Sequence, residues 1–90
     1  MHIDPSIKSG ELAFMCAVAL GDWPRDTINT SGALLHYKRC WRWLEKWERK
    51  GWYDYGVALD LGWLTDEGKQ RAALAAVELS RRLEALGGDD

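Results

Sequence analysis

The chain lacks several features that define large classes of protein. Its longest apolar candidate, the segment 12–20, is far shorter than the roughly 20 residues that cross a bilayer. That segment has an acidic flank and no basic region or cleavage pattern, so we expect no signal peptide. Two cysteines, Cys16 and Cys40, are too few for a disulfide framework, and both lie in apolar helical patterns. These absences predict a cytoplasmic protein with reduced thiols and no membrane partner.

Motifs for catalysis are also missing. The sequence has no glycine-rich phosphate loop, no nucleophile elbow and no pair of carboxylates that we can place in a cleft. His36 and Cys40 stand four residues apart on a predicted helix, a spacing that can share a metal ion, but no second ligand pair accompanies them. We therefore interpret them as a surface histidine and a core cysteine, and predict neither an enzyme nor a cofactor or metal site.

What is present indicates one small globular domain spanning residues 1–90. The chain is 47% hydrophobic and 29% charged, which is ordinary for a folded domain, and six tryptophans add apolar area to a core that must be small. The formal net charge is −2. Any attraction to nucleic acid must therefore come from a local basic patch.

Two helices are predicted in the first third of the chain. Residues 11–20 are apolar on nearly all sides, which is typical of a helix buried between other elements. Asp4 and Ser9 are candidate caps at its start, and Gly21 is a natural stop. Residues 25–33 predict a short second helix running into a turn.

The helix predicted over residues 36–50 carries the most informative pattern. One face is apolar and comprises Tyr37, Cys40, Trp41, Leu44 and Trp47. Six cations lie within an arc of about 120° on the opposite face: Lys38, Arg39, Arg42, Lys46, Arg49 and Lys50. Glu45 and Glu48 flank the apolar face, where they can pair with Arg42 and Arg49, and Trp43 lies on the border. The basic stripe predicts a surface for a negatively charged partner, the alternative being a solvated helix face.

The C-terminal half predicts a hairpin followed by a long helix. Residues 52–55 and 59–64 alternate in polarity around Gly56, which favours a β-hairpin. We expect Trp41, Trp47, Trp52 and Trp63 to lie in the core, because they fall on apolar faces or alternating strands. The last helix begins with the capping residues 65–67 and ends near Leu86. Its apolar positions are Ala72, Ala76, Leu79, Leu83 and Leu86, with Ala73, Val77 and Ser80 beside them. One edge should pack on the first helix, and the rest either closes the domain or forms a two-fold dimer.

Two segments carry a resemblance to a known family. Leu44-Glu45-Lys46-Trp47-Glu48-Arg49-Lys50-Gly51-Trp52 is similar to the end of a recognition helix followed by a first wing strand. Leu64-Thr65-Asp66-Glu67-Gly68-Lys69 is similar to the "LT-x-x-G-K/R" opening of the helix after the wing. With the order of elements, these segments resemble winged helix-turn-helix proteins, particularly the MarR- and PadR-like regulators. The resemblance implies a mainly α fold with a small β-hairpin wing. It also implies that Cys40, Leu44 and Trp47 are the apolar positions of the recognition helix, and that Lys38, Arg39, Arg42 and Lys46 face the groove.

The leading functional expectation is a dimeric, DNA-binding transcriptional regulator of bacterial or phage origin. Its helix 36–50 would lie in the major groove of double-stranded DNA. Arg39 and Arg42 are best placed for base contacts, and Lys46, Arg49 and Lys50 for the phosphate backbone. The homodimer would form through the C-terminal helix.

The alternative is a protein of the same fold that binds a host protein or a nucleoprotein complex. The span 51–64 has no basic residue and carries Asp54 and Asp60, whereas wing tips that bind DNA usually carry Arg or Lys. Trp43, with Tyr53 or Tyr55, would form an exposed aromatic patch of the kind found at protein interfaces. A small phage-encoded inhibitor of host defence, such as an anti-CRISPR protein, fits these features. A structural or assembly module using the same surface is a third possibility.

Overall fold

The fold is mainly helical with one small antiparallel sheet, as predicted. The computed structural model describes residues 3–21, 24 and 37–87. Its elements are α1 (Ser9–Ala19), α3 (Tyr37–Arg49), β1 (Tyr53–Asp54), the 3-10 helix η1 (Leu59–Leu61), β2 (Trp63–Leu64) and α4 (Asp66–Gly87). β1 and β2 pair antiparallel, with Tyr53 opposite Leu64 and Asp54 opposite Trp63. The short helix predicted over 25–33 lies outside the described residues.

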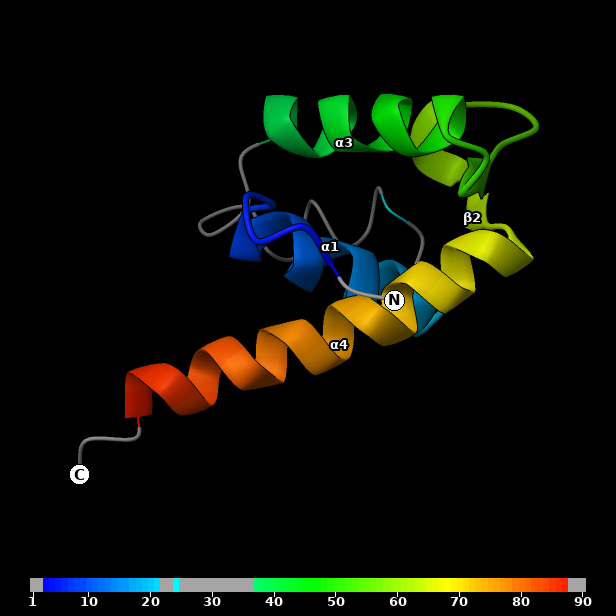
Figure 1. Ribbon diagram of the computed structural model, residues 1–90. Helices are drawn as coiled ribbons and strands as arrows, with labels where there is room; N and C mark the ends of the chain where they lie inside the picture. Colours follow the sequence, from blue (N-terminus) through cyan, green and yellow to red (C-terminus); the bar gives the residue numbers. More distant parts are fainter. Residues whose placement is uncertain (1–2, 22–23, 25–36, 88–90) are drawn as a thin grey trace.

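α1 is the central element, with α3 on one side of it and α4 on the other (Figure 1). Four of its apolar side chains are buried, namely Leu12, Phe14, Met15 and Val18. Packing on two sides explains why its sequence is apolar nearly all round, and confirms the prediction of a buried helix. The helix stops where expected, because Gly21 follows with a φ of 98° that side chains with a Cβ rarely adopt.

α3 turns the predicted apolar face toward α1. Cys40, Leu44 and Trp47 are all 0% exposed. The Trp47 ring stacks on Phe14 with centroids 5.5 Å apart, and such aromatic pairs add to the energy of area burial. Trp41 is only half-buried at the edge of this face. The amphipathic pattern therefore fixes the orientation of α3.

The hairpin is shorter than predicted, because residues 59–61 form a 3-10 turn and not a strand. The buried Tyr53 hydroxyl holds this loop, donating to the Leu59 carbonyl at 2.6 Å and accepting from the Gly62 N–H at 2.8 Å. Burial raises the pKa of Tyr53 to about 12. A Cβ at position 62 would overlap the Asp54 carbonyl, so only glycine permits this close approach. The prediction that Tyr53 contributes to an exposed aromatic patch is wrong, because the tyrosine anchors the loop.

Trp63 is also placed differently from the prediction. It is 53% exposed, because it lies opposite Asp54 on the outer face of the two-residue ladder while Leu64 points into the core. The alternation was identified correctly. Only one face of the hairpin is covered, however, so the expectation of a core tryptophan is wrong.

α4 begins at the predicted cap and extends past the rest of the fold. Thr65 Oγ1 accepts a hydrogen bond from the Gly68 N–H at 3.1 Å and donates one to the Gly51 carbonyl at 2.7 Å. Ala72 and Ala75 are buried. Further along, the apolar stripe emerges into solvent, as Figure 1 shows from the way the end of α4 projects beyond α1. The exposed apolar side chains there are Val77 at 69%, Leu83 at 60% and Leu86 at 83%.

Arg82 fastens the N-terminal segment 3–8 to α4. Its guanidinium donates to the carbonyls of Ile7 at 2.7 Å and Pro5 at 3.3 Å, and to Ser9 Oγ at 3.1 Å. Glu78 holds the guanidinium in place, accepting from Arg82 Nε at 2.8 Å. One ion pair on α4 thus positions a segment more than 70 residues away in the sequence.

Glu78 gives this connection a pH dependence. Hydrogen bonds from Arg81 and then Arg82 lower the pKa of Glu78 from 4.5 to about 2. Because the pKa is lower in the folded chain than in the unfolded one, Glu78 stabilises the fold above about pH 4.5, and this contribution is lost as the pH falls toward 2. Urea denaturation should show Glu78→Gln less stable than the native chain at pH 7 and equal to it near pH 2. A difference that stays constant between these pH values would contradict the assignment.

Candidate partner-binding surface on α3

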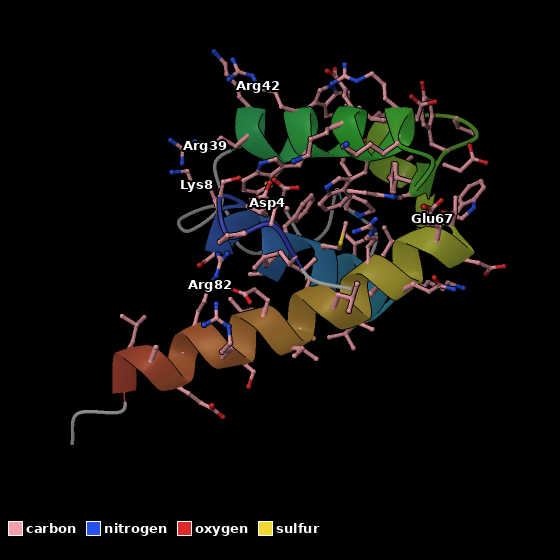
Figure 2. The ribbon with its side chains drawn as sticks, viewed as in Figure 1. Asp4, Lys8, Arg39, Arg42, Glu67 and Arg82 are labelled. Atoms are coloured by element: carbon pink, nitrogen blue, oxygen red, sulfur yellow. The ribbon has the colours of Figure 1, made fainter. Side chains whose placement is uncertain are left out.

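Five of the six cations of the basic stripe are exposed. Lys50 lies over the Trp52 ring, and the other four are Lys38, Arg39, Arg42 and Arg49. Arg39 and Arg42 project away from the body at the N-terminal end of the helix, and Lys8 lies at the same end of the molecule (Figure 2). None of the four makes an ion pair with another residue in the described part of the chain. Their charge is therefore available to a partner.

Positive charge is concentrated in the first turns of α3. Residues 37–42 contain three cations and no acid, whereas residues 43–50 contain Glu45 and Glu48 as well as three cations. Both glutamates are exposed. The ion pairs expected with Arg42 and Arg49 are not formed among the described residues. The helix thus presents a cationic N-terminal end and a mixed C-terminal end.

Lys46 is committed to an intramolecular ion pair. Its Nζ lies 2.7 Å from Oε2 of Glu11 and 2.8 Å from Oε1. Trp47 Nε1 donates to the same carboxylate at 3.0 Å, and Glu11 is only 6% exposed. Glu11 lies in α1, 35 residues before its lysine partner, so no helical spacing in the sequence reveals the pair. Lys46 therefore joins α3 to α1 and has little charge left for a phosphate.

Lys50 and Trp43 also face the body of the protein. Lys50 Nζ lies 5.4 Å from the centroid of the Trp52 ring, beside a cavity between α3 and the N-terminal segment. The Trp43 ring is half-buried, with its centroid 5.9 Å from that of Phe14. Of the seven side chains predicted to bind a partner, Trp43 and Lys46 are half-buried, Lys50 is exposed but lies over the Trp52 ring, and the other four are exposed.

The hairpin carries an exposed apolar surface that sequence reasoning located only in part. Tyr55 is 42% exposed, Val57 92% and Trp63 53%. Of the two acids in the span 51–64, Asp60 is 4% exposed, so only Asp54 adds negative charge to the surface. The hairpin is therefore more apolar than acidic where it meets solvent.

The next question is whether residues 3–21, 24 and 37–87 contain a metal site or a reactive thiol. No group of three or more His, Cys, Asp or Glu side chains gathers there in a way that could hold an ion. Cys16 and Cys40 are free thiols, and burial raises the pKa of both. His36, the possible partner of Cys40, lies outside the described residues.

Over the ranges that the structure describes, no helix combines the length and apolarity needed to span a membrane. Comparison with known proteins finds no family model, curated protein or solved structure that matches the chain.

Proposed function

We propose that the chain is a DNA-binding regulator of the winged helix-turn-helix type, with α3 as its recognition helix. The observation that carries this proposal is the group of exposed, unpaired cations in the first turns of α3: Lys38, Arg39 and Arg42. In helix-turn-helix proteins the N-terminal residues of the recognition helix contact base edges in the major groove. The cations of α3 are concentrated at the end where such contacts are made.

The arrangement of the other elements supports this assignment. α1 and α4 lie behind α3, on the side of its buried face, and the β1–β2 hairpin follows its C-terminal end as a wing would. In the groove, Arg39 and Arg42 would donate to guanine O6 and N7. Lys38 and Arg49 would contact phosphates on either side. Lys46 has no part in the interface, since Glu11 neutralises it.

A two-fold dimer through α4 completes the proposal. Leu83 and Leu86 lie on α4 after Leu79, the last of its side chains that packs against the core, and they are exposed together with Val77. Pairing of two such helices would remove this apolar area from water. Half-sites one helical turn apart are separated by about 34 Å, so the dimer would have to place its two copies of α3 at that spacing.

A second candidate function is binding to a host protein or a nucleoprotein complex, as a phage-encoded inhibitor would do. The exposed Tyr55, Val57 and Trp63 favour it, because aromatic side chains anchor protein interfaces. The span 51–64 also has no basic residue to contact phosphates. In this case the hairpin, and not the start of α3, would make the essential contacts.

Duplex DNA titrated at 50 and 200 mM salt separates the two candidates. Lys38 and Arg49 would contact two phosphates per chain and four per dimer, so the affinity should fall about 12-fold for a monomer and about 150-fold for a dimer between these conditions. Fluorescence anisotropy of a labelled duplex of mixed sequence measures this, and analytical ultracentrifugation gives the stoichiometry. Absence of binding at 50 mM salt would overturn the DNA proposal and leave the hairpin surface as the candidate.

A further inference from the structure

Lys8 adds a further cation beside the start of α3. It directly precedes α1, its side chain is exposed, and it makes no ion pair in the part of the chain that the structure describes. Figure 2 shows it at the same end of the molecule as Arg39 and Arg42. It does not belong to α3, so the proposed recognition helix by itself gives this charge no role.

The packing of α1 on α3 keeps Lys8 at this end. Both helices begin at the same end of the molecule (Figure 1). The first turn of α1 lies against α3, because a Cβ on Gly10 would be 3.4 Å from Cη2 of Trp43. Lys8 precedes Gly10 by two residues, and Arg39 precedes Trp43 by about one helical turn. A duplex that receives the first turns of α3 in its major groove would therefore bring a phosphate strand near Lys8.

Arg82 of α4 holds the chain on both sides of Lys8. Its guanidinium donates to the Ile7 carbonyl at 2.7 Å and to Ser9 Oγ at 3.1 Å, and these residues are the two neighbours of Lys8. A third bond, to the Pro5 carbonyl at 3.3 Å, holds the turn before them. In Figure 2 Arg82 lies between α4 and this segment. Because its backbone is already held, Lys8 loses less conformational freedom when it binds a partner.

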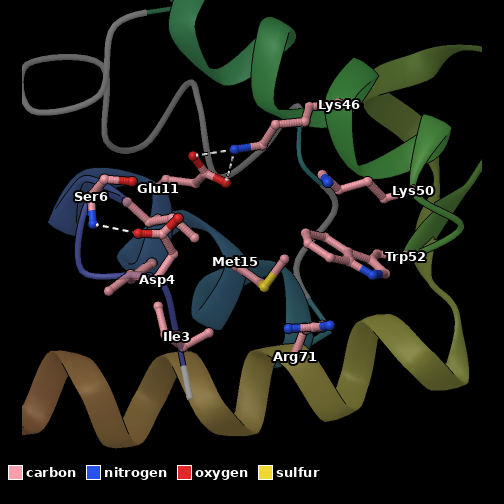
Figure 3. Close-up of a pocket in the computed structure, with 11 residues that line it drawn as sticks. Ile3, Asp4, Ser6, Glu11, Met15, Lys46, Lys50, Trp52 and Arg71 are labelled. Carbon is pink, nitrogen blue, oxygen red and sulfur yellow. Dashed lines mark hydrogen bonds and ion pairs between the residues drawn. The ribbon is translucent and has the colours of Figure 1, made fainter. Parts of the chain in front are cut away.

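The acids closest to Lys8 in the sequence do not pair with it. Asp4 lines the cavity between the N-terminal segment, α1 and the end of α3, and its Oδ1 accepts the Ser6 N–H at 2.9 Å (Figure 3). Glu11, the first acid of α1, is bound by Lys46. The charge of Lys8 is therefore available to a phosphate.

We propose that Lys8 binds the phosphate backbone of the DNA held by α3, and that Arg82 positions it. The inference rests on the proposed function. It extends the DNA-binding surface from α3 to the start of α1, beyond the base pairs that Arg39 and Arg42 would contact. It also gives Arg82 a part in DNA affinity, although this arginine touches no phosphate itself.

Titration of the full chain with a labelled duplex at several salt concentrations tests the contact of Lys8. One phosphate contact contributes about 0.9 to the slope of log affinity against log salt concentration. Lys8 should therefore add a further loss of about 3.5-fold per chain between 50 and 200 mM salt to the loss expected from Lys38 and Arg49. Lys8→Ala should lose this part of the slope and bind at least about threefold more weakly at 50 mM salt. Lys69→Ala, which removes an exposed cation from α4, should keep the native slope.

Substitutions of two neighbouring arginines separate positioning from general charge. Arg82→Gln should lower the salt slope toward that of Lys8→Ala. Arg81→Gln removes a cation that also pairs with Glu78 but does not bond to the N-terminal segment, so it should keep the native slope. In the Lys8→Ala background, Arg82→Gln should have no further effect, because no side chain is left to position. A variant that is merely less stable, but still folded in the assay, would not show this change of slope.

Circular dichroism establishes that each variant is folded before the titration. If Arg82→Gln is not folded, Arg82→Lys replaces it. That variant keeps the charge beside Glu78 but lacks the planar fork that reaches all three acceptors, so it should lower the slope in the same direction.

Two results would overturn this inference alone, in a native chain that binds the duplex. One is a Lys8→Ala variant with the native salt slope. The other is an Arg82 variant whose effect is as large in the Lys8→Ala background as in the native chain. A native chain that does not bind at 50 mM salt would overturn the proposed function as well, so the two failures are distinguishable.

Discussion

Arg39→Ala combined with Arg42→Ala is expected to weaken duplex DNA binding by about 30-fold or more at 50 mM salt, because each lost contact contributes about 1 kcal/mol or more. Both arginines are exposed at the start of α3 and make no contact that holds the core. The variant should therefore have the same Tm as the native chain. Its affinity should also depend less steeply on salt wherever the lost contacts are to phosphates.

A charge-matched control changes one exposed cation elsewhere. Lys69 lies in the first turn of α4, and Lys69→Glu changes the net charge by the same two units. It should alter DNA affinity by less than about threefold, through the long-range field alone. Equal losses in the two variants would mean that general charge, and not the α3 surface, drives binding. If the Arg39 and Arg42 double variant keeps the biological activity of the chain and Trp63→Ser loses it, the result would favour a protein partner.

The helical part of the fold could be predicted because its signals are local. In α3 the spacing of Cys40, Leu44 and Trp47 places all three on one side of the helix, and one buried face is enough to orient it. The start of α4 could be predicted equally well, since Thr65 caps it by accepting a hydrogen bond from the Gly68 N–H three positions further on. Each of these features depends on residues a few positions apart.

The hairpin was predicted less well because its geometry depends on one side chain's position in the folded chain. Alternation over 59–64 is compatible with a strand, but the Tyr53 hydroxyl binds Leu59 and Gly62 and bends this segment into a 3-10 turn. The exposure of Trp63 also depends on the folded chain, because no other element covers the outer face of the hairpin in the described part of the structure. Polarity patterns show that two faces differ, but they do not show that nothing covers the second one.

The candidate surface on α3 could be predicted only in part from the sequence, because its geometry also depends on contacts between distant residues. A helical wheel identifies six cations on one side of α3, but not which of them meets another element. Lys46 contacts Glu11, 35 positions away in the sequence. Lys50 lies over the Trp52 ring, which also contacts Arg71 of α4, 19 positions after Trp52. The cavity behind α3 arises from the same long-range packing. The sequence therefore predicts the cationic side of α3, but not which of its cations stay free of other elements.

Glu11→Ala is expected to lower the free energy of unfolding by about 2 to 4 kcal/mol, the largest stability effect of any substitution proposed for this chain. The substitution leaves the buried Trp47 Nε1–H without its acceptor and Lys46 without its counterion. The lower part of the range allows for Lys46, whose side chain is 34% exposed and can regain water. Urea denaturation at pH 7 measures the loss, which corresponds to a drop in Tm of roughly 10 to 20 °C for a domain of this size.

Two further variants divide this effect into its parts. Glu11→Gln keeps an acceptor for Trp47 while removing the charge, so it should cost less than Glu11→Ala, by about 1 kcal/mol or more. In a double-mutant cycle with Lys46→Ala, the coupling free energy should be at least about 0.5 kcal/mol, because the two side chains are in direct contact. Glu45→Ala, which removes an exposed acid of α3, should change stability by less than about 0.5 kcal/mol. A Glu11→Ala variant as stable as Glu45→Ala would mean that the buried carboxylate does not join α1 to α3.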